Sequence, residues 1–590
     1  MTSDQPHPDH ENGTGPVSQE SICESKVYHH TKNKDGRDQC KEQLPDSEST
    51  KNSEDDEDSP YALIVRRRFS EKREVESITV CINSPLIHKA FQDVIGSYPT
   101  VASDFKSSFK LESPFQILLH YWDALEAYRD GADSPRMRQH LNLLFRFMEE
   151  EMGPERRTLQ HMLQKQMITF KQAWVIYRPG DLVVSDVLGK SWLSRVEKVS
   201  YGTSRNRGPY VTIHMKYCDA NDDAIGEAQR STNIFQSDYF ASDHPAKIRR
   251  LPVYPRKFCD RGPDLEIELL ERGKKFITNR GILTKDYDGI AEWLKEPPLD
   301  FFDPNMADYP PIWLPFTETG RVVLDRKTFE EDNYSHVTMI EEVDNPELFL
   351  CPPYALGYST GRKEWCRYLV DNLRDVTWKE NVWSSLILDQ EQKQVLKALV
   401  MSHKHPERVR SLSEQKGKGL VVLLLKQILQ YATTWNAIIL FDEADVFLES
   451  RDLTSSSTTR TALVAVFLKH LEYFSGIVFL TTNRLSSIDA AMKSRIHLSL
   501  SFGPPEAEVR RQIWKQNLEA VPVDETEIGG EELSSKAAED LIHHKLNGRE
   551  ISNALNTART LARFEEVKLS LQHIETVLKV GQTFGKHIGA

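Results

Sequence analysis

The sequence predicts a multidomain protein with a disordered tail, an α+β N-terminal domain and, toward the C-terminus, an α/β domain built on a parallel sheet. Three observations predict this order. The first 59 residues are polar, apolar residues recur at helical and then at strand spacing between about residues 113 and 215, and short apolar runs alternate with helical segments after about residue 378. A length of 590 residues accommodates about three domains, at roughly 150 residues each.

The tail, residues 1–59, is rich in Ser, Asp, Glu, Lys, Asn and Gln and nearly free of large apolar side chains. Such a segment buries too little apolar surface to offset the entropy lost on ordering. We therefore expect residues 1–59 to be disordered, ending in the acidic run 54–58.

Composition points to an intracellular protein. The net charge is −13, which argues weakly against nucleic acid as the main partner. The seven cysteines form no C-x-x-C pair, as expected of reduced structural thiols. No apolar run approaches the roughly 20 residues of a membrane helix, and the polar N-terminus is no signal peptide. We expect a soluble, cytoplasmic protein, with the nucleus left open.

The N-terminal domain is expected over residues 60–290, as helices followed by a small sheet or barrel. Helical spacing marks three stretches, from residue 113, over 137–152 and over 155–172. Strands of alternating pattern separated by Gly-bearing loops follow. Their aromatic residues either line a ligand groove or pack in the core, and packing is the favoured interpretation for Tyr177, Trp192, Tyr201 and Tyr210.

Residues 291–377 are rich in Pro and Asp in places and predict a connector with limited regular structure. In the next domain, residues 378–503, four apolar runs read as buried parallel strands: 419–425, 437–441, 477–482 and 496–502. Helical patterns lie over 461–473 and 489–493. Strands that alternate with helices favour an α/β parallel sheet.

The strand over 437–441 ends in adjacent carboxylates, Asp442 and Glu443. This is the Walker B pattern, in which one carboxylate is delivered toward Mg²⁺ and the next toward the attacking water. Its partner motif, the phosphate-binding loop G-x-x-x-x-G-K-[ST], occurs nowhere in the sequence. Gly189-Lys190-Ser191 is a decoy, because Val184 stands where the first glycine is required.

Further candidates follow the later runs. Asn483 comes after the third run and can orient water or the γ-phosphate, and Arg495 precedes the fourth and can act on a neighbouring subunit's nucleotide. Gly548 and Arg549 open a late helix, from which the arginine can reach a phosphate. Each of these residues is weak evidence of a site when taken alone. Their order and spacing along the strands of one predicted sheet make the combined evidence strong. The letters D-E-A-D at 442–445 also fit an RNA helicase, but no S-A-T or H-R-x-G-R-like segment accompanies them.

This ordered set resembles the AAA+ ATPases. The sequence around these residues is most similar to the fungal AAA ATPases with a large uncharacterised N-terminal domain. The segments that carry the resemblance are W-N-A-I-I-L-F-D-E-A-D-V-F-L-E at 435–449, V-F-L-K-H-L-E-Y-F at 466–474, S-R-I-H-L-S-L at 494–500 and N-G-R-E-I-S-N-A at 547–554. The stretches 118–282 and 351–371 are also similar. The resemblance implies a P-loop-type AAA+ core over 378–503 and a helical lid over 504–590.

The resemblance also implies an ATP-driven hexameric remodelling machine with ATP and Mg²⁺ as cofactors. Asp442 would order Mg²⁺, Glu443 would polarise water, Asn483 would position it as sensor 1, and Arg495 would serve as the arginine finger. Gly548 and Arg549 match the sensor-2 helix. The N-terminal domain would select a protein substrate or adaptor.

The chain departs from the family at one place. Relatives carry a phosphate-binding loop, a further strand and a pore loop after the strand that matches 420–425, whereas here Leu425 is followed directly by a helix-like segment leading to Asp442. We expect ATP hydrolysis to be impaired, and we favour a splicing or gene-annotation event over an evolved loss because the other motor residues remain. The alternative is a nucleotide-independent AAA-like scaffold that binds partners.

Overall fold

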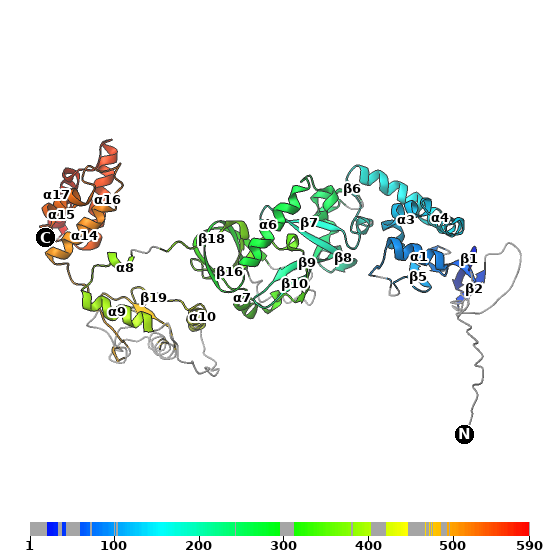
Figure 1. The fold of residues 1–590 in the computed structure, drawn as a ribbon, viewed down its shortest axis with the longest axis horizontal. Coiled ribbons are helices and arrows are strands. Elements are labelled where there is room, and N and C mark those ends of the chain that lie inside the picture. Colours follow the sequence, from blue (N-terminus) through cyan, green and yellow to red (C-terminus); the bar gives the residue numbers. More distant parts are fainter. Residues whose placement is uncertain are drawn as a thin grey trace, which may run out of the picture. The chain divides into compact units, whose positions relative to one another are not determined.

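The computed structural model describes residues 21–32, 38–42, 60–70, 74–99, 101, 104–241, 244–295, 312–378, 382–402, 420–445, 467, 471, 474, 476–484, 493–494 and 496–588. The chain divides into two units, Met1–Val376 and Thr377–Ala590. Figure 1 labels their helices and strands. No helix of the described residues is long and apolar enough to cross a membrane.

The first unit begins with a five-stranded sheet of order β2-β1-β3-β4-β5. Its strands are β1 (Ile22–Lys32), β2 (Asp38–Glu42), β3 (Tyr61–Phe69), β4 (Val75–Ile82) and β5 (Phe109–Glu112). β1 pairs with β3 in parallel, and the other neighbours are antiparallel. The expectation that residues 1–59 form only a disordered tail is therefore wrong for 22–32 and 38–42. The alternating pattern of β1 lies in a short polar segment, and backbone pairing with β3 supplies what its side chains do not.

Four helices accompany this sheet: α1 (Pro85–Val94), α2 (Gln116–His120), α3 (Trp122–Asp130) and α4 (Pro135–Gln164). Ser84 and Ser134 cap α1 and α4, each followed by Pro at the first helical position, a favoured start. The second and third predicted helical stretches, separated near Pro154, are one helix up to Gln164, because α4 continues through this proline. Apolar side chains of the sheet and these helices form one core.

A six-stranded sheet follows, of order β12-β7-β8-β9-β10-β15. Its strands are β7 (Leu182–Val187), β8 (Lys190–Ser204), β9 (Gly208–Ala220), β10 (Ile225–Phe235), β12 (Val253–Pro255) and β15 (Ile340–Glu342). A small sheet pairs β6 (Met167–Ile168) with β11 (Ala246–Lys247), and α5 (Gln236–Tyr239) follows β10. The predicted small antiparallel sheet is therefore present.

Two aromatic residues considered for a groove in this sheet pack in the core. Tyr177 is fully buried and donates its hydroxyl to the carbonyl of Val253 at 2.7 Å. Trp192 is buried, donates its indole N–H to the carbonyl of Leu350 at 2.9 Å, and lies 3.7 Å beneath the guanidinium of Arg230. Only Tyr201 is substantially exposed. The packing interpretation fits these residues better than a ligand groove.

The segment expected to be a connector is instead a second β-domain of this unit. A five-stranded sheet of order β14-β16-β17-β13-β18 is built from β13 (Leu283–Lys295), β14 (Ile312–Leu324), β16 (Tyr354–Ser359), β17 (Glu364–Leu369) and β18 (Leu373–Asp375). Helices α6 (Asp264–Thr278) and α7 (Arg326–Asp332) belong with it. One core contains residues of both larger sheets, among them Leu193 of β8, Leu269 of α6 and Tyr368 of β17. The predicted boundary at 290 therefore cuts through β13 and through this core.

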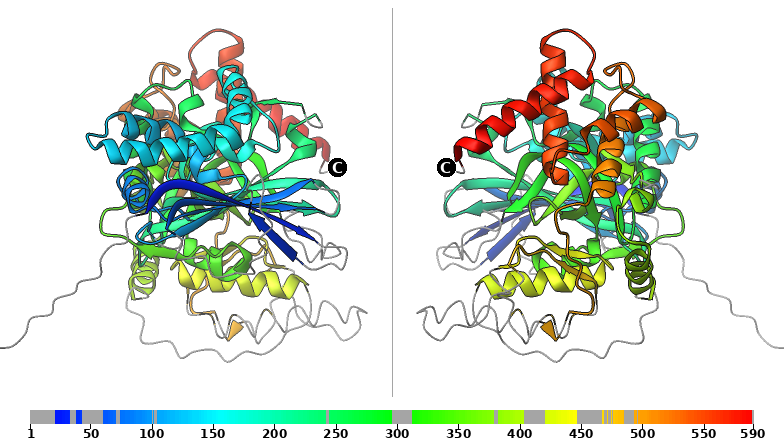
Figure 2. Two further views of the ribbon diagram at one scale, coloured as in Figure 1. Left: turned by 90° about the vertical axis from the view of Figure 1, so that its right-hand side faces the viewer. Right: turned by 90° about the vertical axis from the view of Figure 1, so that its left-hand side faces the viewer.

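The second unit opens with α8 (Val382–Ser385), α9 (Gln390–Ser402) and α10 (Leu420–Thr434), followed by the parallel pair β19 (Ile439–Phe441) and β20 (Val478–Leu480). Figure 2 shows α10 as one yellow helix. The predicted strand over 419–425 is thus wrong, because residues 420–434 hold no Gly or Pro and form one helix that ends four residues before β19. Residues 496–502 also form no strand. The helical patterns over 461–473 and 489–493 lie almost entirely outside the described residues.

The unit ends in four helices, α14 (Ala507–Glu519), α15 (Glu531–Leu541), α16 (Gly548–Phe564) and α17 (Leu571–Ile588). Their core surrounds Trp514, which is fully buried. The Asn547 side chain accepts the backbone N–H of Glu550, and the Glu550 carboxylate accepts the backbone N–H of Asn547. This reciprocal pair at the start of α16 is a capping box. The predicted helical lid over 504–590 is therefore present.

Gly273 of α6 is required by a close backbone approach, which generates a stability prediction. A Cβ at this position would lie 2.0 Å from the carbonyl oxygen of Leu348, so the helix must shift to accommodate it. We expect Gly273→Ala to lower the free energy of unfolding by about 1–3 kcal/mol, measured as a lower Tm in calorimetry. Gly262→Ala is the control, since nothing lies within 4 Å of its Cβ. An equal Tm for the two variants would contradict the close contact.

His120 generates a pH prediction. Its ring nitrogens contact the Tyr98 hydroxyl at 3.0 Å and the carbonyl of Trp174 at 3.3 Å, and burial lowers its pKa from 6.5 to about 4. As pH falls, His120 therefore binds its proton at a higher pH in the unfolded chain than in the folded chain. Stability should be full above about pH 6.5 and decline toward pH 4, by up to about 3 kcal/mol.

The pH prediction is measured by urea unfolding across this pH range. His120→Gln should show a shallower decline than the natural chain, while exposed His161→Gln should keep the natural slope. The slope is the readout, because the glutamine also alters two hydrogen bonds. A His120→Gln profile parallel to that of the natural chain would refute the assignment.

Candidate functional site

The carboxylates Asp442 and Glu443 lie directly after β19, at the end where β20 also stops. The parallel register pairs Phe441 with Leu480, so the turn after β19 faces the turn after β20. The N–H of Ala444 donates to the carbonyl of Thr481 at 2.8 Å, and the N–H of Thr481 donates to the carbonyl of Phe441 at 3.0 Å. Both carboxylates are exposed. The prediction that β19 presents them at a strand end fits this geometry.

Thr481 connects the two carboxylate residues, and sequence reasoning missed this role. Its hydroxyl donates to the carboxylate of Asp442 at 2.5 Å and accepts the N–H of Glu443 at 2.9 Å. The backbone of Glu443 lies in the left-handed region, with φ of 52°. The neighbouring Thr482 hydroxyl similarly donates to Asp445. The Thr-Thr pair at the end of the third apolar run was the available signal, because threonine hydroxyls there face the neighbouring strand's turn.

Among the described residues, no hydrogen bond or ion pair joins Asn483 or Arg549 to this pair. Asn483 lies in the bend after β20 and is exposed. Arg495 lies outside the described residues. Gly548 and Arg549 begin α16, where the arginine is exposed. In the described part of the chain, no hydrogen bond or ion pair joins Arg549 to Asp442 or Glu443.

The described residues around Asp442 do not fit a bound nucleotide with Mg²⁺. Within the described residues, no group of three His, Cys, Asp or Glu side chains could hold a metal ion. Asp442 is one carboxylate, already bonded to Thr481, whereas Mg²⁺ requires near-octahedral oxygen ligation. The segment before β19 is helix α10, and the four residues 435–438 link it to the strand. The N–H groups of Trp435, Asn436 and Ala437 donate back to carbonyls of α10. This segment offers no row of loop amides for phosphates.

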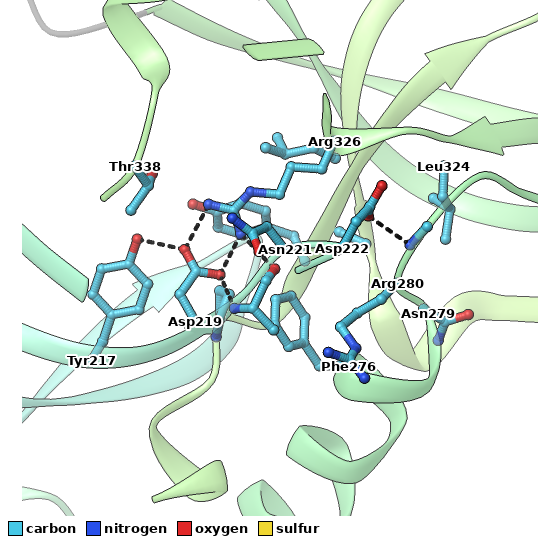
Figure 3. Close-up of a pocket in the computed structure, with 16 residues that line it drawn as sticks. Tyr217, Asp219, Asn221, Asp222, Phe276, Asn279, Arg280, Leu324, Arg326 and Thr338 are labelled. Carbon is cyan, nitrogen blue, oxygen red and sulfur yellow. Dashed lines mark hydrogen bonds and ion pairs between the residues drawn. The ribbon is translucent and has the colours of Figure 1, made fainter. Parts of the chain in front are cut away.

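The first unit contains a polar pocket that the sequence did not predict, drawn in Figure 3. Its volume is about 70 Å³, and its centre is the buried ion pair of Asp219 and Arg326. The guanidinium donates to both carboxylate oxygens, at 2.6 and 2.9 Å, and to Glu330 at 2.8 Å, while Tyr217 donates its hydroxyl to Asp219 at 3.0 Å. Burial opposes the charged guanidinium, but the carboxylates of Asp219 and Glu330 together outweigh it and raise the pKa of Arg326. These groups satisfy one another, so the pocket's charged centre is structural.

Comparison with known proteins adds three family matches. Residues 397–504 match the model described as ATPase family associated with various cellular activities (AAA), and residues 506–590 match the fungal AAA+ ATPase lid domain. Residues 158–260 match a domain of unknown function, DUF7025. These matches confirm an AAA domain followed by a helical lid and preceded by an α+β region.

No curated protein matches the chain. A similar solved structure is a chain of the Escherichia coli MS115-1 HORMA:CdnC:Trip13 complex, with 21% identity and a TM-score of 0.23. The match covers 28% of this chain and 59% of that chain.

Thr481 generates a prediction about local order at the carboxylate pair. Thr481→Val removes both the donor to Asp442 and the acceptor of the Glu443 N–H. Because the site is exposed, water should replace these bonds and global stability should change by less than about 1 kcal/mol. Hydrogen exchange of the Glu443 amide should become faster. Thr482→Val is the matched control, since its hydroxyl bonds Asp445 instead. Unchanged exchange at Glu443 in the Thr481 variant would count against the bridge.

Proposed function

We propose, from the premise that this chain belongs to the AAA ATPases and carries their fungal lid domain, that it descends from remodelling ATPases but does not itself hydrolyse ATP. One observation carries the proposal. Asp442 and Glu443 remain at the end of β19, yet helix α10 leads into that strand and the sequence has no G-x-x-x-x-G-K-[ST] loop.

The physical reason is charge. An AAA domain implies nucleotide and Mg²⁺ by family, and a triphosphate needs backbone amides and a lysine around its phosphates. Without that loop, the phosphate charge has no cradle and Mg²⁺ loses its Ser/Thr ligand. Removing a single electrostatic donor from an active site slows catalysis by about 100- to 1000-fold. Removing the whole loop should abolish turnover.

The site residues have proposed roles in the ancestral reaction. Asp442 would order Mg²⁺, Glu443 would polarise water, and Asn483 would position that water. Arg495 would act on the nucleotide of an adjacent subunit in a homo-hexamer, and Gly548 with Arg549 would contact phosphate from the lid. Their retention supports the interpretation that the loop was lost by splicing or annotation, because a chain long free of catalysis has no reason to keep all of them.

The second candidate is a nucleotide-independent scaffold that binds a protein partner through its first unit. Two observations favour it. The first unit has hydrophobic cores of its own, and the Thr481 hydroxyl gives the Asp442 carboxylate a hydrogen-bond donor within the chain. A net charge of −13 makes a protein a better partner than nucleic acid.

ATP turnover tests the proposal. The purified chain, incubated with ATP and Mg²⁺, should release phosphate no faster than its Glu443→Gln variant, because neither binds the triphosphate productively. Calorimetric titration should likewise show no ATP binding that depends on Asp442. The readouts are phosphate release and heat of binding.

Turnover that Glu443→Gln abolishes would sink the proposal and restore the active ATPase. If turnover is absent, partner capture that is identical with and without ATP supports the scaffold. The control variant is Glu449→Gln, a nearby carboxylate with no assigned role.

A further inference from the structure

Strand β15 forms an edge of the six-stranded sheet in the first unit. It pairs only through Ile340, Glu341 and Glu342, which face Ala228, Glu227 and Gly226 of β10. In the described part of the chain, no strand pairs with its other side. An open strand edge presents unpaired N–H and C=O groups that can hydrogen-bond an added strand.

The segment around this edge is unusually apolar for a surface. Met339 is 87% exposed, Tyr334 is 82% exposed and Val337 is 51% exposed, and Val343 continues the exposed apolar surface beyond the strand. Ile340 alone packs inward, against the Trp192 cluster. Natural proteins usually protect open edges with charge, proline or cover. Apolar side chains gathered at an open edge mark a binding surface.

The same segment is acidic. No Lys or Arg occurs between Lys327 and Arg362. Glu330 and Glu347 are engaged by Arg326 and Arg195. Exposed Glu331, Glu342 and Asp344 have no ion-pair partner among the described residues. Their charge favours basic groups and repels phosphates, which disfavours nucleic acid and anionic lipid.

Cavities lie at both ends of β15. Val343, Asn345 and Pro346 line one of about 230 Å³, whose charged groups are already paired as Arg195–Glu347 and Lys216–Glu227. Thr338, just before the strand, lines the pocket around Asp219 (Figure 3). The larger cavity has room for one side chain of a segment lying along the edge.

We propose that β15 docks an extended segment of a partner protein in which apolar and basic residues alternate. The backbone of that segment would pair with the open edge, its apolar residues would cover Met339 and Val343, and its basic residues would face Glu342 and Asp344. The proposal deepens the partner-binding role proposed for the first unit and rests on it.

The structure offers a specific way to disable the edge. A Cβ on Gly226 would lie 1.9 Å from the carbonyl oxygen of Glu341, so only glycine lets β15 approach β10 here. Gly226→Val should displace β15 from the sheet. Glu342→Lys should leave the strand in place and reverse its charge, which keeps the test valid if the glycine variant folds poorly.

The experiment uses the full chain without nucleotide and two fluorescein-labelled octapeptides, one alternating Lys with Val and Leu, the other with Glu in place of Lys. Fluorescence anisotropy should show binding of the basic peptide only, weakened at high salt. Glu342→Lys should weaken it by about tenfold or more, and Gly226→Val should abolish it. Hydrogen exchange should show protection of residues 338–345 on binding.

The matched control is Glu112→Lys, the same charge change on β5. This strand is at the edge of the first five-stranded sheet, β2-β1-β3-β4-β5. It should bind the basic peptide as the natural chain does. Equal binding of the acidic peptide, unchanged affinity in Glu342→Lys, protection elsewhere, or no binding at about millimolar peptide would each overturn the proposal. So would protection, in the free chain, of those amides in 338–345 that are not hydrogen-bonded to β10, because it would mean that the chain covers its own edge. None of these outcomes bears on ATP hydrolysis.

Discussion

The ion pair between Asp219 and Arg326 is the interaction on which the first unit depends. Asp219 is almost fully buried, and removing two charges from water costs several kcal/mol per ion unless their hydrogen bonds are satisfied. Here Arg326 donates to both carboxylate oxygens of Asp219, to the carbonyl of Ala220 and to Glu330. The Tyr217 hydroxyl also donates to Asp219. The pair fixes the end of β9 to the start of α7, and so sets how the two larger sheets share one core. Such a pair specifies geometry more than it adds stability.

The sequence predicted what depends on local pattern and missed what depends on distant pairing. Helix-start residues indicated α4 and α16, and apolar runs indicated β19 and β20, whereas α1 was not predicted. By contrast, β13 and β14 pair over thirteen residues each, yet the prolines and aspartates between 296 and 311 suggested a connector. The strands β1 and β2 were missed for the same reason, since their partners and not their own side chains make them strands. The run 420–425 was misassigned because apolar residues without alternation suit a buried strand and a helix equally.

At the carboxylate pair, the order of residues along the chain predicted the position at a strand end, but it did not predict the hydrogen bonds. Asp442 and Glu443 could be placed at a strand end from the letters alone, because a buried strand followed by two acids has few other interpretations. The bridging hydroxyl of Thr481 could not, since it arises from the parallel register of β19 with β20, 39 residues apart in sequence at Asp442 and Thr481. Arg549 is an exposed residue at the start of α16, the helix whose apolar side chains pack in the core around Trp514. The Walker B letters thus stand in a sequence that has no G-x-x-x-x-G-K-[ST] loop.

Strand β1 lies between β2 and β3. Its parallel pairing covers the edge of β3 that faces away from β4. β3 carries four consecutive buried residues, 62–65, in a strand of nine. A cut within 43–59 would leave β1 held without a covalent link to β3, by its backbone pairing and by the packing of Val27 on the core, and loss of that peptide would expose an edge of β3. Strand β1 therefore occupies an edge of β3 that would otherwise present unpaired backbone groups to another chain.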